Sequence, residues 1–123
     1  MELEYRQHIG TIKRIPHRRK YKMRKVKVAA VQMRCTRDVN ANIANAERLV
    51  RKAAGDGAQI ILLPEFFERQ YFCQERQYAY YEFAKPVGEN DAGKHFAKVA
   101  EELKVVLPIS FYEKDGKRLF NTV

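Results

Sequence analysis

Apolar residues fall along this chain in two kinds of pattern, short runs that are almost wholly apolar and longer stretches with periodic spacing. The short runs are residues 26–33, 59–63 and 105–111, and their length and β-branched content are typical of buried strands. In residues 39–53 and 91–103 the apolar residues recur every three or four positions, which places them on one face of a helix. The first strand, helix and strand, joined by short connections, predict a βαβ unit with parallel strands.

The ends of these elements carry recognisable signals. Asp38 or Asn40 is suited to cap the start of the first helix, and Gly55-Asp56-Gly57 is suited to end it. Pro64 ends the second strand because it has no N–H to donate. Pro108 lies inside the third apolar run, which predicts an edge strand or a bulge there.

The second half of the chain predicts one more helix and a hairpin. Residues 74–85 are predicted to be helical, with Tyr78, Tyr81 and Phe83 on an aromatic side, and residues 86–90 to form a turn. Asp115-Gly116 predicts a hairpin turn between the third strand and a fourth that starts at Leu119. Together these elements predict an α/β fold with a βαβ start and a late hairpin.

The charge of +9 is concentrated at the N-terminus. Residues 1–25 hold nine of the 24 basic residues and two of the 15 acidic ones. Residues 1–22 also lack any apolar period, so they predict a basic, disordered extension, with the folded domain at 23–123. A basic arm that binds nucleic acid or an anionic membrane is the alternative, but basic runs without a partner fold are usually solvated, so nucleic acid is not the expected partner.

Several other classes of protein are not supported by the composition. No apolar run has the length of a membrane span. The two cysteines have no metal-binding spacing and the chain shows no secretory signal, which indicates a reduced, cytoplasmic protein. The three histidines do not form a set and there is no glycine-rich phosphate loop, so neither a metal nor another cofactor is predicted.

Glu65 is the first candidate for chemistry because it lies just past the end of the second predicted strand. Ligand sites of open α/β sheets lie beyond the carboxyl ends of strands. Four aromatic residues follow Glu65 and are expected to exclude water from a general base; they are Phe66, Phe67, Tyr71 and Phe72. The alternative is a surface acid balanced by Arg69.

The two cysteines are candidate nucleophiles of a weaker kind. Cys73 follows Glu65 in the same loop, with Arg69 and Arg76 nearby in sequence. Free cysteines are more often small packed residues than reactive ones, and we expect both Cys73 and Cys35 to be packed and inert.

These stretches resemble the N-terminal part of the nitrilase superfamily of carbon–nitrogen hydrolases. The resemblance is carried by VKVAAVQM (26–33), GAQIILLPEFF (57–67) and FYEKDGKRLFNTV (111–123). With ERQYFCQ, AKPVGEN and VVLPISFYE, the chain looks most like the branch that hydrolyses N-carbamoylputrescine to putrescine, carbon dioxide and ammonia in polyamine biosynthesis. Another amidase of the superfamily, such as one similar to β-ureidopropionase, is the alternative.

The resemblance implies a fold and a mechanism. It implies a four-layer α-β-β-α sandwich that forms homo-oligomers and hydrolyses a small-molecule amide or carbamoyl amine with a Glu-Lys-Cys triad and no cofactor. Glu65 matches the catalytic glutamate, and Tyr71 falls at a tyrosine of the substrate pocket.

The other two members of the triad are not matched. Their motifs would lie beyond Val123, and neither Lys117 nor Cys73 is in the right motif to replace them. We therefore expect an N-terminal fragment, truncated within a strand and inactive by itself.

Overall fold

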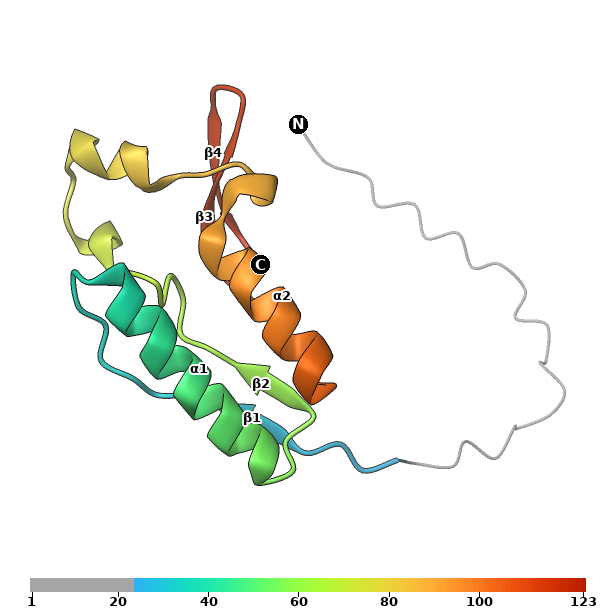
Figure 1. The fold of residues 1–123 in the computed structure, drawn as a ribbon. Coiled ribbons are helices and arrows are strands. Elements are labelled where there is room, and N and C mark those ends of the chain that lie inside the picture. Colours follow the sequence, from blue (N-terminus) through green and yellow to red (C-terminus); the bar gives the residue numbers. More distant parts are fainter. Residues whose placement is uncertain (1–23) are drawn as a thin grey trace, which may run out of the picture.

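The computed structural model describes residues 24–123 (Figure 1). The predicted basic extension at 1–22 and the domain boundary at 23 lie outside the described residues. The elements run in the order β1 (Val28–Ala30), α1 (Val39–Gly55), β2 (Ile60–Leu62), the 3-10 turns η1 (Phe72–Gln74), η2 (Tyr78–Phe83) and η3 (Val87–Glu89), α2 (Asp91–Leu103), β3 (Phe111–Asp115) and β4 (Arg118–Thr122).

The parallel βαβ start is confirmed. β1 and β2 pair in parallel, with Val28 opposite Ile60 and Ala30 opposite Leu62. Asp38 is the N-cap of α1 and accepts a hydrogen bond from the Ala41 N–H at 3.0 Å. After α1 the chain reverses through Gly57, whose φ of +88° favours glycine, and returns to begin β2.

The predicted third strand at 105–111 is wrong as a single element. Only Val106 pairs with β2: its N–H donates to the Gln59 carbonyl at 2.8 Å, and its carbonyl accepts from the Ile61 N–H at 2.9 Å. Two residues later Pro108 has no N–H, so the pairing cannot continue. Regular pairing resumes at Phe111, which starts the antiparallel β3–β4 hairpin.

The predicted helix at 74–85 is also wrong. The chain forms the separate 3-10 turns η1 and η2, with Gln77 in an extended conformation between them. Residues three apart eclipse one another in a 3-10 turn, and here they are aromatic pairs: Tyr78 contacts Tyr81, and Tyr80 stacks on Phe83. The aromatic side chains of this segment therefore pack on one another within the turn, and the segment does not form an amphipathic helix.

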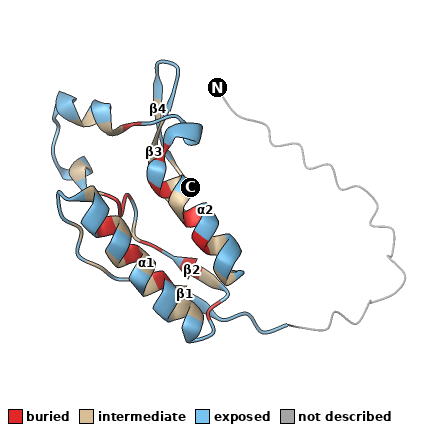
Figure 2. Ribbon diagram, viewed as in Figure 1, coloured by how far each residue is buried: buried red, intermediate tan, exposed pale blue. Residues whose placement is uncertain are grey.

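The hydrophobic core lies between the two helices and one face of the β1–β2 sheet (Figures 1 and 2). α1 and α2 contact each other and present buried side chains inward, as the helical spacing predicts. Phe67 from the loop after β2 meets Phe96 of α2 edge to face, with ring centroids 5.2 Å apart. Burying one such side chain contributes about 1.5–3 kcal/mol, so these two rings fix the loop to the helix layer.

The opposite face of the sheet is open. Val28, Leu62 and Val106 lie on this face and are 68%, 51% and 58% exposed. The described residues thus form a helical layer on the two-stranded β1–β2 sheet, with β3–β4 as a second two-stranded sheet, and the predicted α/β fold is confirmed. The β3–β4 hairpin stands at the end of the molecule where α2 begins, next to the loop that follows β2 (Figure 1).

Candidate active site

The loop that carries Glu65 is a turn with a strained backbone conformation. Residues 65–68 form the turn, and the Arg69 N–H closes it on the Phe66 carbonyl at 3.0 Å. Phe66 has a φ of +51°, which costs energy in any residue with a Cβ. This reversal directs Phe66 and Phe67 into the protein, where both are buried, and leaves Glu65 exposed.

The turn is held by contacts that compensate for its strain. The Phe66 N–H donates to the Ser110 hydroxyl at 3.4 Å, and the Phe66 ring stacks on Phe72 and meets Tyr112 of β3 edge-on. The expectation that the aromatic residues would shield Glu65 from water is therefore wrong for the described chain. The rings of Phe66 and Phe67 anchor the loop, and the carboxylate stands outside them.

Two polar side chains accompany Glu65. Asn121 of β4 donates its side-chain amide to Glu65 Oε1. The negative charge of Glu65 is the largest cause of a raised pKa of the Tyr71 hydroxyl, followed by that of Cys73. Glu65 and Tyr71, predicted from the sequence, thus lie together, and Asn121 joins them without any signal in the local pattern that could have identified it.

The far end of the turn is tied to the start of both helices. Glu68 is buried, and burial raises the pKa of its carboxyl. Its side chain accepts from Asn90, the N-cap of α2, at 3.5 Å. Its backbone carbonyl accepts from the Asn42 amide in the first turns of α1 at 3.1 Å. The turn is consequently fixed at Phe66, Phe67 and Glu68, on three sides.

Arg69 does not balance Glu65. Its guanidinium lies over the ring of Phe83, 4.2 Å from the ring centroid, and no ion pair joins it to Glu65 among residues 24–123. This cation–π contact adds to the packing of η2 on the loop.

The two cysteines differ from each other. Cys35 is half-buried against the core, and burial raises the pKa of its thiol, as expected for a packed residue. Cys73 is exposed, so the prediction that it is packed is wrong. Cys73 lies in η1 directly after Phe72. The Phe72 ring points inward and packs on Phe66 and Phe83, and Cys73 then faces outward.

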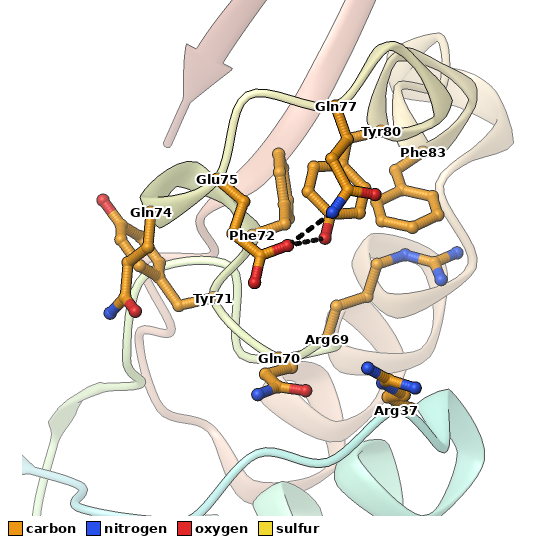
Figure 3. Close-up of a pocket in the computed structure, with 10 residues that line it drawn as sticks. All are labelled: Arg37, Arg69, Gln70, Tyr71, Phe72, Gln74, Glu75, Gln77, Tyr80 and Phe83. Atoms are coloured by element: carbon orange, nitrogen blue, oxygen red, sulfur yellow. Dashed lines mark hydrogen bonds between the residues drawn. The ribbon is translucent and has the colours of Figure 1, made fainter.

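A hollow of about 440 Å³ opens beside Tyr71 (Figure 3). Within it, the Glu75 carboxylate accepts hydrogen bonds from the Gln77 amide and the Tyr80 hydroxyl, each at 2.7 Å. The bond to Glu75 is the largest cause of a raised Tyr80 pKa. The other residues lining the hollow include two arginines; the full set is Arg37, Arg69, Gln70, Tyr71, Phe72, Gln74, Glu75, Gln77, Tyr80 and Phe83. Its volume suits a small ligand.

The described part of the chain holds neither a cluster of metal-binding side chains nor a helix suited to cross a membrane. Over residues 24–123, no three side chains of His, Cys, Asp or Glu come together in a way that could hold a metal ion. None of the helices in this range has the length and apolar character that crossing a membrane requires.

The family model of carbon–nitrogen hydrolases matches residues 27–123. The N-carbamoylputrescine amidase of Oryza sativa subsp. japonica is 46% identical over 99 residues, which are 80% of this chain and 33% of the relative. That of Solanum lycopersicum is 45% identical over 102 residues, 83% of this chain and 34% of the relative. The citrullinase of Francisella tularensis is 36% identical over 101 residues, 82% of this chain and 35% of the relative.

Among solved structures, a carbon–nitrogen hydrolase from Helicobacter pylori G27 superposes with a TM-score of 0.69 at 22% identity, over 78% of this chain and 33% of that one. This likeness shows the fold. Because the family model spans almost the whole described region, the chain belongs to the carbon–nitrogen hydrolases. It spans about a third of the length of the curated relatives that it matches.

Proposed function

We propose that residues 23–123 are the N-terminal part of an amidase domain that hydrolyses N-carbamoylputrescine, with Glu65 as the general base and Tyr71 in the substrate pocket. The observation that carries the proposal is the placement of Glu65: it follows β2, accepts a hydrogen bond from Asn121 and lies beside Tyr71, which lines the hollow. Four plant N-carbamoylputrescine amidases at 41–46% identity support the choice of substrate.

In the proposed reaction, the Glu65 carboxylate accepts the proton of a cysteine thiol, and the thiolate attacks the carbamoyl carbon. Protonated Glu65 gives this proton to the departing nitrogen, so ammonia leaves, Glu65 is a carboxylate again, and a carbamoyl thioester remains on the cysteine. Glu65 then takes a proton from water, which cleaves the thioester and restores the thiol. The released carbamic acid breaks down to putrescine and carbon dioxide.

The lysine and the nucleophilic cysteine of this triad are not found among the 123 residues. We infer that these residues do not catalyse the reaction by themselves and that the rest of an amidase domain supplies both groups. The experiment therefore uses the complete product of the reading frame that carries this chain, with the 123-residue chain as its inactive counterpart.

A second candidate substrate is a ureido acid, which carries a carboxylate where N-carbamoylputrescine carries an ammonium. Arg37 and Arg69 in the hollow favour an anionic group, whereas Glu75 favours a cationic one. One relative is named a citrullinase, and citrulline is a ureido acid that carries an α-ammonium beside its carboxylate.

The test measures ammonia release from N-carbamoylputrescine, N-carbamoyl-β-alanine and citrulline by the complete product. We expect the highest kcat/KM with N-carbamoylputrescine. Hydrolysis of a ureido acid without hydrolysis of N-carbamoylputrescine would refute the proposed substrate, and failure to hydrolyse any of the three would refute the amidase function.

Two further properties are proposed for the complete protein: a cytoplasmic location, supported by the two free cysteines, and a homo-oligomeric state, supported by the resemblance to the superfamily. Light scattering of the purified product tests the second: a monomer at all concentrations would contradict it.

A further inference from the structure

We propose that Asn121 is a positioning residue that holds the Glu65 carboxylate in the orientation needed for proton transfer. This rests on the proposed role of Glu65. The contact joins side chains 56 residues apart, one in the turn after β2 and one in β4. The Glu65 side chain is exposed, and Tyr71 of the same loop lies beside it, so Asn121 holds it from a different element of the fold.

The position of Asn121 is itself fixed. It lies opposite Tyr112 in the β3–β4 pairing. The Tyr112 ring packs on Phe66 and Phe72, with ring centroids 6.0 and 5.3 Å apart. The Tyr112 carbonyl also accepts from the Lys85 N–H at 3.0 Å. The hairpin is thus bound to the same turn that carries Glu65, so the donor and the acceptor belong to one packed unit.

The chemistry of the pair suits a base and its support. An ionised carboxylate only accepts hydrogen bonds, and the amide N–H₂ of asparagine only donates and does not titrate. Asn121 can therefore fix Oε1 without competing for the proton. Oε2 remains available to receive a proton from a thiol or from water, and its direction is set by the bond at Oε1.

A purely structural role is the competing explanation, because the same bond also links the hairpin to the loop. The two roles differ in what they change. Positioning acts on the rate of proton transfer and so on kcat, whereas a structural link acts on stability and on the shape of the substrate pocket.

The experiment compares four variants of the complete product: Asn121→Ala, Asn121→Asp, Glu65→Gln and the control Thr122→Val. Thr122 is the neighbour of Asn121 in β4, and its hydroxyl bonds to Glu113 instead of Glu65. We expect Asn121→Ala to lower kcat by roughly 10- to 100-fold with little change in KM, and Thr122→Val to stay within about twofold of wild type.

Asn121→Asp provides a measurement, the pH dependence of activity, that would not change if the role of Asn121 were purely structural. The new carboxyl has the shape of the amide but faces Glu65 with a second negative charge, so kcat should fall further at neutral pH. On acidification a proton shared by the two carboxyls restores the bond, so the activity of this variant relative to Asn121→Ala should rise as the pH falls. A ratio that does not change with pH would overturn the proposal.

The outcomes separate this proposal from the proposed function. If Glu65→Gln keeps its activity, the role of Glu65 fails and that of Asn121 fails with it. If Glu65→Gln is inactive while Asn121→Ala matches Thr122→Val in kcat, only the role of Asn121 is overturned.

A measurement on the unaltered side chain covers the case in which the Asn121 variants do not fold. The side-chain amide resonances of Asn121 in an ¹⁵N-labelled sample should shift on Glu65→Gln. Resonances that do not respond to this substitution would show that the two groups are not in contact and would overturn the proposal.

Discussion

Replacing Asn42 by alanine should destabilise the protein through the loop that carries Glu65. Asn42 is 2% exposed. Its Oδ1 accepts from the Thr36 N–H at 2.8 Å and from the Thr36 hydroxyl at 3.2 Å. Its amide donates to the carbonyls of Thr36 at 2.7 Å and of Glu68 at 3.1 Å. The Asn42 side chain therefore holds two loops, one at Thr36 and one at Glu68, against the start of α1.

The magnitude follows from the groups left without a partner. Each buried polar group that loses its hydrogen bond costs about 1–3 kcal/mol. Thr36 is exposed, so water can replace part of its lost hydrogen bonds. The bond to the Glu68 carbonyl is buried, so that carbonyl would be left without a partner. Alanine returns roughly 0.6 kcal/mol through its higher helix propensity. The expected net loss in the free energy of unfolding is about 2–3 kcal/mol.

The assay is urea unfolding of the purified protein, followed by circular dichroism. Asn40→Ala is the matched control, since Asn40 lies two residues earlier in the same helix, is exposed and undergoes the same change of residue type. That variant should be unchanged or slightly more stable. If the two variants differed by less than about 0.5 kcal/mol, the reasoning from the Asn42 bonds would be refuted.

Three further predictions concern single residues. Lys104 ends α2 in the left-handed conformation with a φ of +54°, so Lys104→Gly should raise the free energy of unfolding by up to about 1 kcal/mol in the same urea assay. The pKa of the Glu47 carboxyl is lowered by its hydrogen bonds from Arg51 and His95. These bonds therefore stabilise the fold above the usual carboxyl pKa, and their contribution is lost as the pH falls through the lowered pKa of Glu47. The melting temperatures of wild type and Glu47→Gln should accordingly converge in acid. Cys73 is exposed while Cys35 is half-buried with a raised pKa, so a thiol reagent at mildly alkaline pH should modify Cys73 first, as read by mass spectrometry of peptides; preferential modification of Cys35 would contradict the described positions.

The elements that the sequence predicts well are those with a local cause. The periodic apolar residues of α1 and α2 define their buried faces, and Asp38 caps α1 through a bond to a residue three positions later. Pro64 limits β2, and Asp115-Gly116 places the hairpin. In each case the signal and the structure that it specifies lie within a few residues of one another.

The features that the sequence does not reveal depend on distant partners. The aromatic residues at 74–85 resemble a helix face, but their 3-10 turns are set by Phe72, Phe83 and Arg69. The positive φ of Phe66 is stabilised by Ser110, 44 residues away. Asn42 and Asn121 are ordinary polar residues in the sequence, and their importance follows from bonds that span 26 and 56 residues.

The role of Glu65 is tested most directly by the rate of ammonia release from N-carbamoylputrescine by the complete product and by its Glu65→Gln variant. Glu82→Gln, at an exposed carboxylate of η2, is the control for the loss of one negative charge. A general base contributes roughly 100- to 10,000-fold to the rate, so Glu65→Gln should lose at least about 100-fold in kcat while Glu82→Gln stays near wild type. A Glu65→Gln variant that retains more than about a tenth of the wild-type kcat would contradict the account.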